Sequence, residues 1–492
     1  MLEKIKNSAI FFKNKIKNAL GFKDREPNSL SGQKGSRAVS DLVDQILLEA
    51  SAFEESFYEQ PSLAILNEAI ESFEKVLRID PKNWQGLHKF LNLCTTSGHA
   101  RKGLLLNERI ISLKREIQKQ YDLDGLGITV LPAGYGKAIG NLAILDLIIK
   151  AQRLGLLEPS RLILPARPGQ SANESLLKIL SKHIKVVRQD AGIAAVKDFE
   201  GYGEVGGAIV LNSKTRHFWE ASHTIQKEWE RQKLAPIFSD SEEGQRNALD
   251  YLKKFGFRDG DWYVCLHVRT AEKYDDEWSL RNANINHYYP AIKRIVESGG
   301  WVIRMGGPEL AGIPQIDRSI DFAKSADRSE CLDISLIAGC RFFFGTASGL
   351  AHVATMFGKP SLLTNWMPWG IMPWGSRDLI IPKLLRDRAS GRILTAEESL
   401  SEPIGFIQDE RHMRIHNIEA LENNEEELSD GVEEMLSAIK LHQEGKMTLG
   451  RYQAMFQETE RQIGICNSSG RLCETFGAKH PELWVCSQKR QK

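Results

Sequence analysis

The sequence lacks long apolar runs, paired-cysteine motifs and any excess of charge of one sign. No stretch approaches the roughly 20 consecutive apolar residues of a membrane-spanning helix, and the first 23 residues lack the pattern of a cleavable signal peptide. The seven cysteines form neither a C-x-x-C pair nor a zinc-ligand spacing. Lys and Arg total 65 against 64 Asp and Glu. We therefore expect a cytoplasmic protein with reduced thiols that binds no nucleic acid and meets any anion at a local basic site.

The composition that remains is that of an ordinary soluble protein with room for about three domains. The chain has 492 residues, of which 42% are hydrophobic and 26% charged. Shifts in composition and periodicity divide it into five segments. They are a basic amphipathic arm and linker (1–40), a helical region (41–125), a first α/β domain (126–245), a second α/β domain (246–440) and a C-terminal helical tail (441–492).

The first segment combines a lysine-rich arm with a polar linker. Within residues 1–23, lysines surround Ile, Phe and Leu in a pattern compatible with a helix that lies on an anionic membrane. A solvated arm is the alternative. Residues 24–40 are polar and contain Gly, Ser and Pro, which predicts a linker. The prediction is a cytoplasmic protein with peripheral contact at the inner face of the membrane through residues 1–23.

The helical region carries one repeat-like unit. Ala69, Phe73 and Pro81 stand at the offsets of a tetratricopeptide repeat (TPR), but Gly103 and Asn107 occupy positions where small and aromatic packing residues should recur. The sequence thus predicts a small all-α, TPR-like region. It either packs on the next domain or binds a protein partner.

Two series of alternating strands and helices follow. In the first, GITVLPAG and RLILPA flank a helical stretch, and IKVVRQ and GAIVLN are further strand candidates for an open parallel sheet. In the second, WYVCLHVR, WVIRMGG, RFFFG and KPSLLT are separated by helical stretches. We expect two tandem Rossmann-like, doubly wound domains. Such sheets bind ligands beyond the carboxyl ends of their strands.

Polar residues cluster at two of these strand ends. His267 and Arg269 share one face of a strand, where the guanidinium could hold a diphosphate, although an arginine paired to a carboxylate is the alternative. Arg304 can add a second positive charge, and Gly306 permits a tight turn.

Two further strand ends offer a phosphate seat and an aromatic wall. Thr346 and Ser348 precede a helix whose first turn presents free N–H groups. After the next strand come Trp366, Trp369 and Trp374, which either stack on sugar rings or pack in the core. Arg281 and Asn282 lie in a polar loop that is open to a ligand or forms a plain turn.

Residues 331–360 resemble the donor-binding half of glycosyltransferases with the GT-B fold, notably the heptosyltransferase-like enzymes. The matching positions are Ser348, Gly349, His352, Gly358 and Pro360. The His267-x-Arg269 segment is similar to the guanine-nucleotide sugar site of fucosyltransferases. From about 126 to 485, the segments HVR, RN, VIRMGG, GTASGL, TNW, IPKLLR and NNEEEL together resemble a bacterial family of glycosyltransferases of surface-carbohydrate clusters.

This resemblance implies a metal-independent GT-B glycosyltransferase without a cofactor. It would move a sugar from a nucleotide-diphosphate sugar to a glycan, lipid-linked or protein acceptor. The donor-binding residues it implies are His267, Arg269, Arg304, Gly306, Thr346, Ser348, Gly349, His352 and Asn365. The acceptor-binding residues it implies are Gly134, Gly136 and Asn141.

The general base is open at this stage. Heptosyltransferase-like enzymes carry Asp after an Ile-Gly pair, whereas this chain has Asn141, which cannot accept a proton. Asp275 and then Asp276 are the predicted catalytic residues, with Glu174 and His217 next. Two other functions remain possible from the sequence, a nucleotide-sugar epimerase of the same fold and a non-catalytic, TPR-bearing scaffold.

Overall fold

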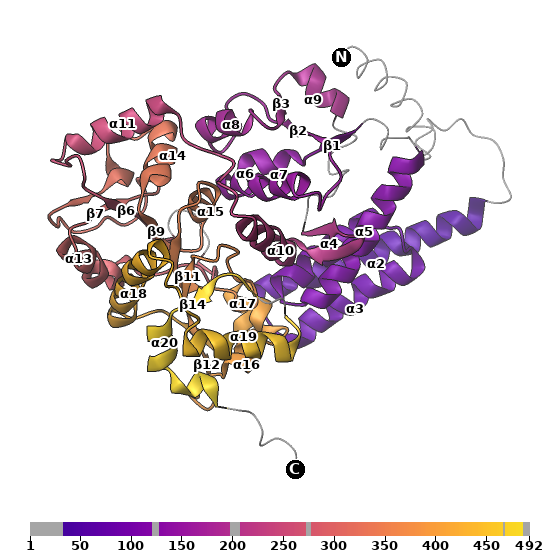
Figure 1. Ribbon diagram of the computed structural model, residues 1–492. Helices are drawn as coiled ribbons and strands as arrows, with labels where there is room; N and C mark the ends of the chain where they lie inside the picture. Colours follow the sequence, from indigo (N-terminus) through magenta and orange to yellow (C-terminus); the bar gives the residue numbers. More distant parts are fainter. Residues whose placement is uncertain (1–32, 121–126, 197–206, 272–276, 466–467, 486–492) are drawn as a thin grey trace.

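The computed structural model describes residues 33–120, 127–196, 207–271, 277–465 and 468–485 (Figure 1). Predictions for the amphipathic arm, residues 1–23, therefore lie outside the described residues. Over the described ranges, no helix is long and apolar enough to cross a membrane. The molecule is a mixed α/β structure with one large parallel sheet, one small sheet and many helices.

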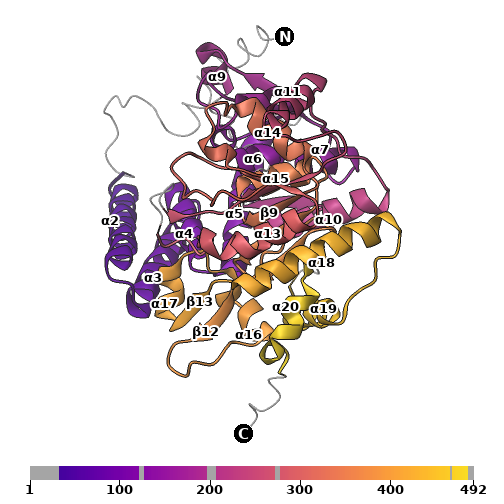
Figure 2. The ribbon, with the colours of Figure 1, turned by 90° about the vertical axis from the view of Figure 1, so that its left-hand side faces the viewer.

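Four helices form the N-terminal part of the described chain. They are α2 (Gln33–Glu59), α3 (Leu63–Ile79), α4 (Trp84–Thr96) and α5 (Ala100–Gln120), which lie together on one side of the molecule (Figures 1 and 2). Ala69 and Phe73 are fully buried in their shared core. Because α2 begins at Gln33, the predicted linker of residues 24–40 is wrong over its last part, which is helical. The TPR assignment stays a prediction.

The small sheet is parallel, in the order β1 (Ile128–Val130), β2 (Arg161–Pro165) and β3 (Lys185–Val187). The accompanying helices are α6 (Ile139–Ala143), α7 (Leu145–Arg153), α8 (Glu174–Leu180), α9 (Asp190–Val196) and α10 (Phe218–Arg231). The predicted fourth strand of this sheet is wrong. β4 (Ala208–Leu211) instead pairs antiparallel with β5 (Lys214–His217), because Asn212 and Ser213 both adopt positive φ and close a tight hairpin.

The large sheet has seven parallel strands. It contains β6 (Tyr263–His267), β7 (Trp301–Arg304), β8 (Ser319–Ile320), β9 (Phe342–Thr346), β10 (Ser361–Trp366), β11 (Leu379–Pro382) and β14 (Arg471–Leu472). Their order is β14-β11-β10-β9-β6-β7-β8. The chain thus runs outward from β6 through β7 and β8, returns to β9 beside β6 and runs outward in the other direction. The point of reversal lies between β6 and β9.

Helices cover this sheet and short elements close its ends. The helices are α11 (Glu242–Lys253), α13 (Tyr289–Glu297), α14 (Glu330–Gly339), α15 (Gly349–Met356), α16 (Ala396–Leu400), α17 (Glu410–Ile415), α18 (Glu425–Gln443), α19 (Arg451–Ile463) and α20 (Glu474–Lys479). A separate antiparallel pair joins β12 (Leu384–Asp387) to β13 (Ile418–Leu421). Since β14 pairs with β11, the predicted helical tail of residues 441–492 also supplies an edge strand of the sheet, which the sequence analysis missed.

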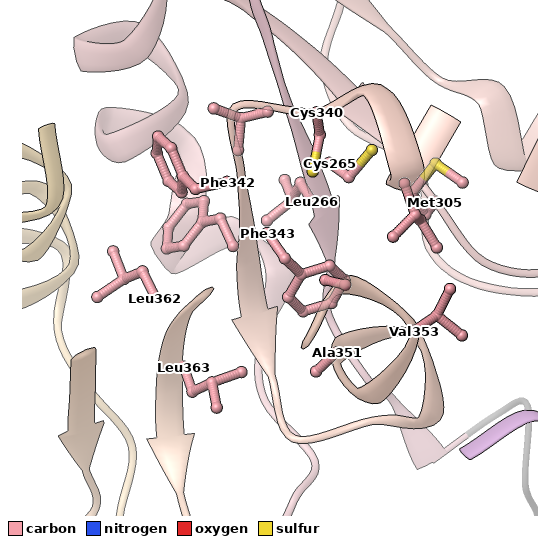
Figure 3. Close-up of a cluster of buried hydrophobic side chains, with 14 of the residues drawn as sticks. Cys265, Leu266, Met305, Cys340, Phe342, Phe343, Ala351, Val353, Leu362 and Leu363 are labelled. Atoms are coloured by element: carbon pink, nitrogen blue, oxygen red, sulfur yellow. The ribbon is translucent and has the colours of Figure 1, made fainter. Parts of the chain in front are cut away.

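The centre of the sheet is apolar on both faces. Cys265 and Leu266 of β6 and Phe343 of β9 are fully buried, and Val353 of α15 packs among them (Figure 3). Strands covered by helices on both faces read as continuous apolar runs. This explains why the apolar segments WYVCLHVR, WVIRMGG, RFFFG and KPSLLT indicated β6, β7, β9 and β10 from the sequence.

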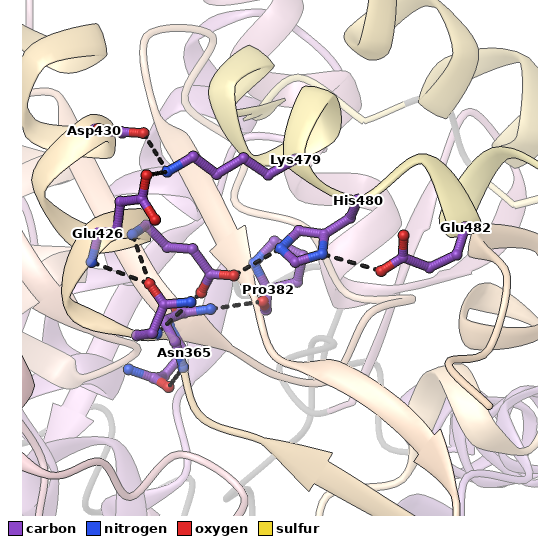
Figure 4. A network of polar contacts seen from close by, with 10 residues as sticks. Asn365, Pro382, Glu426, Asp430, Lys479, His480 and Glu482 are labelled. Atoms are coloured by element: carbon purple, nitrogen blue, oxygen red, sulfur yellow. Dashed lines mark hydrogen bonds and ion pairs between the residues drawn. The ribbon is translucent and has the colours of Figure 1, made fainter. Parts of the chain in front are cut away.

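A polar network fastens the C-terminal helices to this domain. Lys479 at the end of α20 forms ion pairs with Asp430, at 2.5 Å, and Glu426, at 2.8 Å, both on α18 (Figure 4). Next to it, Nε2 of His480 lies 2.6 Å from Oε1 of Glu427. These contacts bind the segment that follows β14 to the helix that covers the sheet.

Candidate functional site

The site lies at the point of reversal of the large sheet, where β6 and β9 end side by side. The backbone N–H of Arg269 donates a 2.9 Å hydrogen bond to Oγ1 of Thr346, which joins the two strand ends. Gly345 has φ +136°, and a Cβ there would lie 1.9 Å from the carbonyl oxygen of His267. A glycine is therefore required for this approach. Open α/β sheets bind ligands at this kind of position.

Arg269 and His267 are brought together here as the sequence predicts, and both are nearly buried. Arg269 is 8% exposed, and its backbone carbonyl accepts a hydrogen bond from Ala283. His267 is 2% exposed, with Nδ1 3.4 Å from the carbonyl oxygen of Met305. A cation and an imidazole at the end of an apolar strand are costly to desolvate, which is compatible with an anionic ligand.

Helix α15 begins directly beyond β9. Ser348 precedes it in extended conformation, but its hydroxyl makes no capping hydrogen bond. Oγ of Ser348 is buried and has no hydrogen-bond partner among the described residues. The first turn of α15 thus has a donor available for a ligand, at the end of the helix where the dipole favours negative charge.

The small sheet reaches this helix through α6. A Cβ on Gly349 would lie 2.5 Å from Cγ2 of Ile139 and 2.6 Å from the backbone nitrogen of Gly140. Any side chain at Gly349 would therefore force α6 away. The Ser348-Gly349 turn of the large sheet and the Ile139-Gly140 pair of the small one meet at this point.

His352 lies one turn into α15, beside the same contact. Its ring stacks on Trp374 with a centroid distance of 4.9 Å and a tilt of 36°. Burial, followed by the positive charge of Arg281, lowers the pKa of His352 to about 4. The imidazole is therefore neutral near pH 7 and can exchange hydrogen bonds without carrying charge.

Of the three tryptophans that follow β10, one reaches the site and two do not. Trp374 lies against His352, and its Nε1 is buried without a hydrogen-bond partner within the described ranges. Trp366 and Trp369 are core residues, whose indole N–H groups donate to the carbonyl oxygens of Ile371 and Lys383. The predicted roles are stacking on sugar rings and core packing, and the structure shows core packing for Trp366 and Trp369.

Arg304 has protein partners of its own. It is 1% exposed, forms an ion pair with Asp321 at 3.4 Å and donates to the carbonyl oxygen of Ala311. Gly306, which follows β7, has φ +123°, and a Cβ there would lie 2.6 Å from Leu310. Arg304 therefore has a structural partner that the sequence analysis did not foresee, and it stays out of the proposal below.

Asn365 is likewise engaged within the protein. Its φ is +49°, which Asn tolerates better than most residues. Its Oδ1 accepts from the backbone N–H of Asn423 at 2.8 Å, and its Nδ2 donates to the hydroxyl of Tyr288 at 3.0 Å. The side chain links β10 to the segment before α18.

The predicted acceptor residues follow the carboxyl end of β1. Gly134 and Gly136 lie in a short 3-10 helix (Ala133–Lys137), and Asn141 lies in α6, exposed. Gly140, next to Asn141, touches α15. The predicted acceptor residues therefore lie on the segment that faces the point of reversal.

The predicted catalytic residues Asp275 and Asp276 lie outside the described residues. Glu174 pairs with Arg188 at 2.5 Å, and this arginine holds the pKa of Glu174 below its usual value. His217 precedes α10, and its Nε2 lies 2.9 Å from the carbonyl oxygen of Ala100. Both alternatives for the base thus have structural partners.

In the described part of the chain, no three His, Cys, Asp or Glu side chains are grouped to hold a metal ion.

The sequence analysis missed Lys383. It follows β11 at the carboxyl end of the sheet, is 5% exposed and donates from Nζ to the carbonyl oxygen of Asn282 at 2.8 Å. Burial lowers its pKa. A lysine directly after the apolar run Leu379–Pro382 was the signal available in the sequence.

Comparisons with known proteins give partial structural similarity. No protein-family description matches the sequence, and no curated protein matches it. Among solved structures, ADP-heptose LPS heptosyltransferase II of E. coli is similar with a TM-score of 0.33 and 14% identity, over 49% of this chain and 86% of that one. A glycosyl transferase family 9 protein of Veillonella parvula is similar with a TM-score of 0.29 and 13% identity, over 48% of this chain and 79% of that one. E. coli heptosyltransferase WaaC with ADP is similar with a TM-score of 0.24 and 13% identity, over 52% of this chain and 90% of that one. At these TM-scores the similarity carries no argument, so the proposal below depends on this chain's own residues.

Proposed function

We propose that this chain is a glycosyltransferase that holds a nucleotide-diphosphate sugar at the point of reversal of the large sheet and transfers the sugar to an acceptor held by the small sheet. The observation that carries the proposal is the juxtaposition of Arg269, Thr346 and the start of α15 at the carboxyl ends of β6 and β9. The resemblance of residues 331–360 to GT-B donor domains supports the same assignment.

Charge development explains why these groups suit glycosyl transfer. When the bond from the sugar to the diphosphate breaks, negative charge grows on the leaving phosphate. In this proposal Arg269 and the N-terminus of α15 stabilise that charge, and the hydroxyl of Ser348, which has no partner among the described residues, donates to a phosphate oxygen. A preorganised, nearly buried cation is worth more here than in water.

The acceptor side of the proposal uses α6 and the segment before it. Gly134, Gly136 and Asn141 would bind the acceptor, and Asp275 or Asp276 would take its proton. Both sheets contribute because Gly140 contacts Gly349. The acceptor is a glycan, a lipid-linked sugar or a protein, in surface-carbohydrate synthesis. We further propose a cytoplasmic enzyme whose residues 1–23 contact the membrane.

Donor binding is the first test. Calorimetry with UDP, GDP, CDP, ADP and dTDP should give binding by at least one nucleotide to the wild type, with EDTA present. Arg269→Met should weaken it about 10- to 100-fold, because one charge-assisted contact is lost. Arg392→Met is the matched control, since Arg392 is an exposed arginine paired with Glu398. Equal affinity of the Arg269 and Arg392 variants would refute the site.

Turnover is the second test. Release of nucleoside diphosphate from a panel of donor sugars, with and without acceptor oligosaccharides, should depend on Asp275 or Asp276. The corresponding Asn variant should lose several orders of magnitude in turnover while it keeps donor affinity, because an amide cannot accept the proton. Normal turnover by both variants would move the base elsewhere.

A further inference from the structure

A cavity opens at the opposite, amino end of the large sheet. It has a volume of about 650 Å³, within the range of small-molecule sites. Its wall is formed by residues that precede or begin β6, β9, β10 and β14, together with the end of α18 and the segment before α19. The residues at the point of reversal do not line it.

Four cationic side chains line this cavity, and each is partly buried. They are Arg341, Lys359, Arg377 and Arg471. Over the described part of the chain, no carboxylate oxygen lies within 4.0 Å of their side-chain nitrogens, so none of them forms an ion pair there. Partly desolvated cations without a close ion-pair partner are costly. A bound anion would remove that cost.

The four cations approach from different parts of the chain and keep few internal partners. The guanidinium of Arg341 lies over the ring of Trp262, 4.5 Å from its centroid, and Arg377 donates to the carbonyl oxygen of Gly358. Nε of Arg471 is buried and has no hydrogen-bond partner among the described residues. Arg377 and Arg471 both act on His442, a further lining residue, and, after burial, lower its pKa.

The carboxylates nearest to Arg471 are occupied elsewhere. Glu474 accepts hydrogen bonds from the backbone N–H groups of Tyr452 and Gln453 at the start of α19. Glu434 accepts from the backbone of Glu474 and Thr475 at the start of α20. These two side chains cap helices, and neither forms an ion pair with Arg471, although their charges still act on it from a greater distance.

The remaining carboxylates around the cavity are also engaged. Asp261, the acidic residue that lines it, accepts from the backbone of Arg258 and from Nε1 of Trp301. Glu230 accepts from Gln226 and from the backbone of Ser376. Asp378 is fully buried beneath, and burial raises its pKa to about 7, so its charge is largely absent below neutral pH. Among the residues that line the cavity, four are cationic and one, Asp261, is acidic.

The opposite wall is apolar. Met435, Ala438 and Ile439 of α18 face the cavity, as do Met447 and Leu449 of the segment that follows. A site with several cations on one side and methionine and aliphatic groups on the other suits a ligand with a multiply charged group attached to an apolar or flat body.

We propose that this amino-end cavity is a second ligand site, which binds a small organic phosphate outside the carboxyl-end site. Phosphate monoesters and diphosphates carry the two or more negative charges that four cations can meet, and arginine contacts phosphate oxygens in pairs. The proposal does not depend on the glycosyltransferase assignment, because no residue is shared between the two ends.

The test uses inorganic pyrophosphate as probe and full-length protein in which the carboxyl-end site is weakened by Arg269→Met. Calorimetry in this background should still detect pyrophosphate. Adding Arg377→Met or Arg471→Met should weaken that binding about 10- to 100-fold. Adding Arg392→Met, an exposed arginine elsewhere, should leave it unchanged. Circular dichroism confirms that each variant is folded.

A chemical footprint gives an independent readout that needs no variant. Phenylglyoxal should modify Arg377 and Arg471, and pyrophosphate should protect both but not Arg392, as read by peptide mass spectrometry. Three outcomes would overturn the proposal, the first two of which are as follows. One is equal pyrophosphate affinity in the Arg377, Arg471 and Arg392 variants, and the other is modification of Arg377 and Arg471 that pyrophosphate does not slow. Loss of binding by Arg269→Met alone would overturn it as well, since all binding would then occur at the carboxyl end.

Discussion

The two ends of the large sheet are built by different means. At the carboxyl end, strands and helices approach so closely that glycine is required, and Arg269 lies nearly buried next to Thr346. At the amino end, the chain leaves an open cavity lined by four cations that form no ion pair with any residue the structure describes. At the carboxyl end the backbone contacts leave no room for a side chain at Gly345, whereas the amino end is an open cavity lined by cations. Substitution of Gly345 should therefore lower stability, whereas substitution of the amino-end cations should lower ligand affinity.

The largest expected effect tests the backbone contact at the carboxyl end. Gly345→Ala should reduce the free energy of unfolding by about 5 kcal/mol, because its Cβ would meet the His267 carbonyl at a φ that other residues rarely adopt. Urea unfolding measures this. Gly134→Ala is the control, with no atom within 4 Å of the new methyl and an expected change below about 0.5 kcal/mol. Equal stability of the two variants would show that β6 and β9 can separate freely.

The second prediction concerns a carboxyl group at the amino end. Burial raises the pKa of Asp378 to about 7, so the folded protein keeps a proton that the unfolded chain loses near pH 4. The free energy of unfolding should therefore fall as pH rises from 4 to 7, by up to about 4 kcal/mol from this group. Asp378→Asn should flatten this slope.

Unfolding in urea at several pH values measures the effect. Exposed Asp259 provides the control, since Asp259→Asn should keep the wild-type slope. Part of the slope should remain in Asp378→Asn, because burial also raises the pKa of Glu460 to about 7. A slope identical to wild type would mean that Asp378 is ionised in the folded protein.

The third prediction tests whether Arg304 stabilises the fold without contributing to nucleotide binding, unlike Arg269. Asp321→Asn leaves the buried guanidinium of Arg304 without its counter-charge and should cost about 3 kcal/mol of stability. Glu398→Gln breaks an exposed ion pair with Arg392 and should cost less than about 1 kcal/mol. Nucleotide affinity should stay the same in both variants. A loss of affinity with unchanged stability in Asp321→Asn would return Arg304 to the donor site.

The smallest effect concerns the link through Asn365. Tyr288→Phe removes hydrogen bonds to Oγ1 of Thr364 and Nδ2 of Asn365 and should cost about 1 kcal/mol of stability. Tyr289→Phe, its neighbour, should change stability less. Calorimetric donor affinity should match wild type in both. A tenfold loss of affinity in Tyr288→Phe would assign Asn365 to the ligand after all.

The sequence predicted four of the seven strands of the large sheet, β6, β7, β9 and β10, because buried parallel strands leave continuous apolar runs that end in glycine or polar residues. It did not predict β8, β11 or β14. It misplaced β4, since an apolar run does not reveal its partner. The signal was Asn212-Ser213 between two short runs, a pair suited to positive φ in a hairpin. It also could not foresee that Arg304 pairs with Asp321, a contact that depends on the path of the chain between β7 and β8.

The position of a residue relative to a strand also decides whether its place in a site can be predicted from the sequence. Residues of the carboxyl-end site follow strands directly, so their position in the sequence indicates their position in the fold. The cations of the amino-end cavity lie between Arg341 and Arg471 and share no motif. Only the strand order brings them together. Arg471 in particular depends on β14, which the sequence analysis did not expect.

The late arrival of β14 has a consequence for synthesis. β11 ends at Pro382, whereas its neighbour β14 begins at Arg471. During translation, one edge of β11 therefore stays unpaired until α18 and α19 have been synthesised. An unpaired parallel edge can recruit a strand from another chain. During translation the protein therefore passes through a period in which its main sheet is open to wrong partners, and the closing of that edge coincides with the delivery of Arg471 to its cavity.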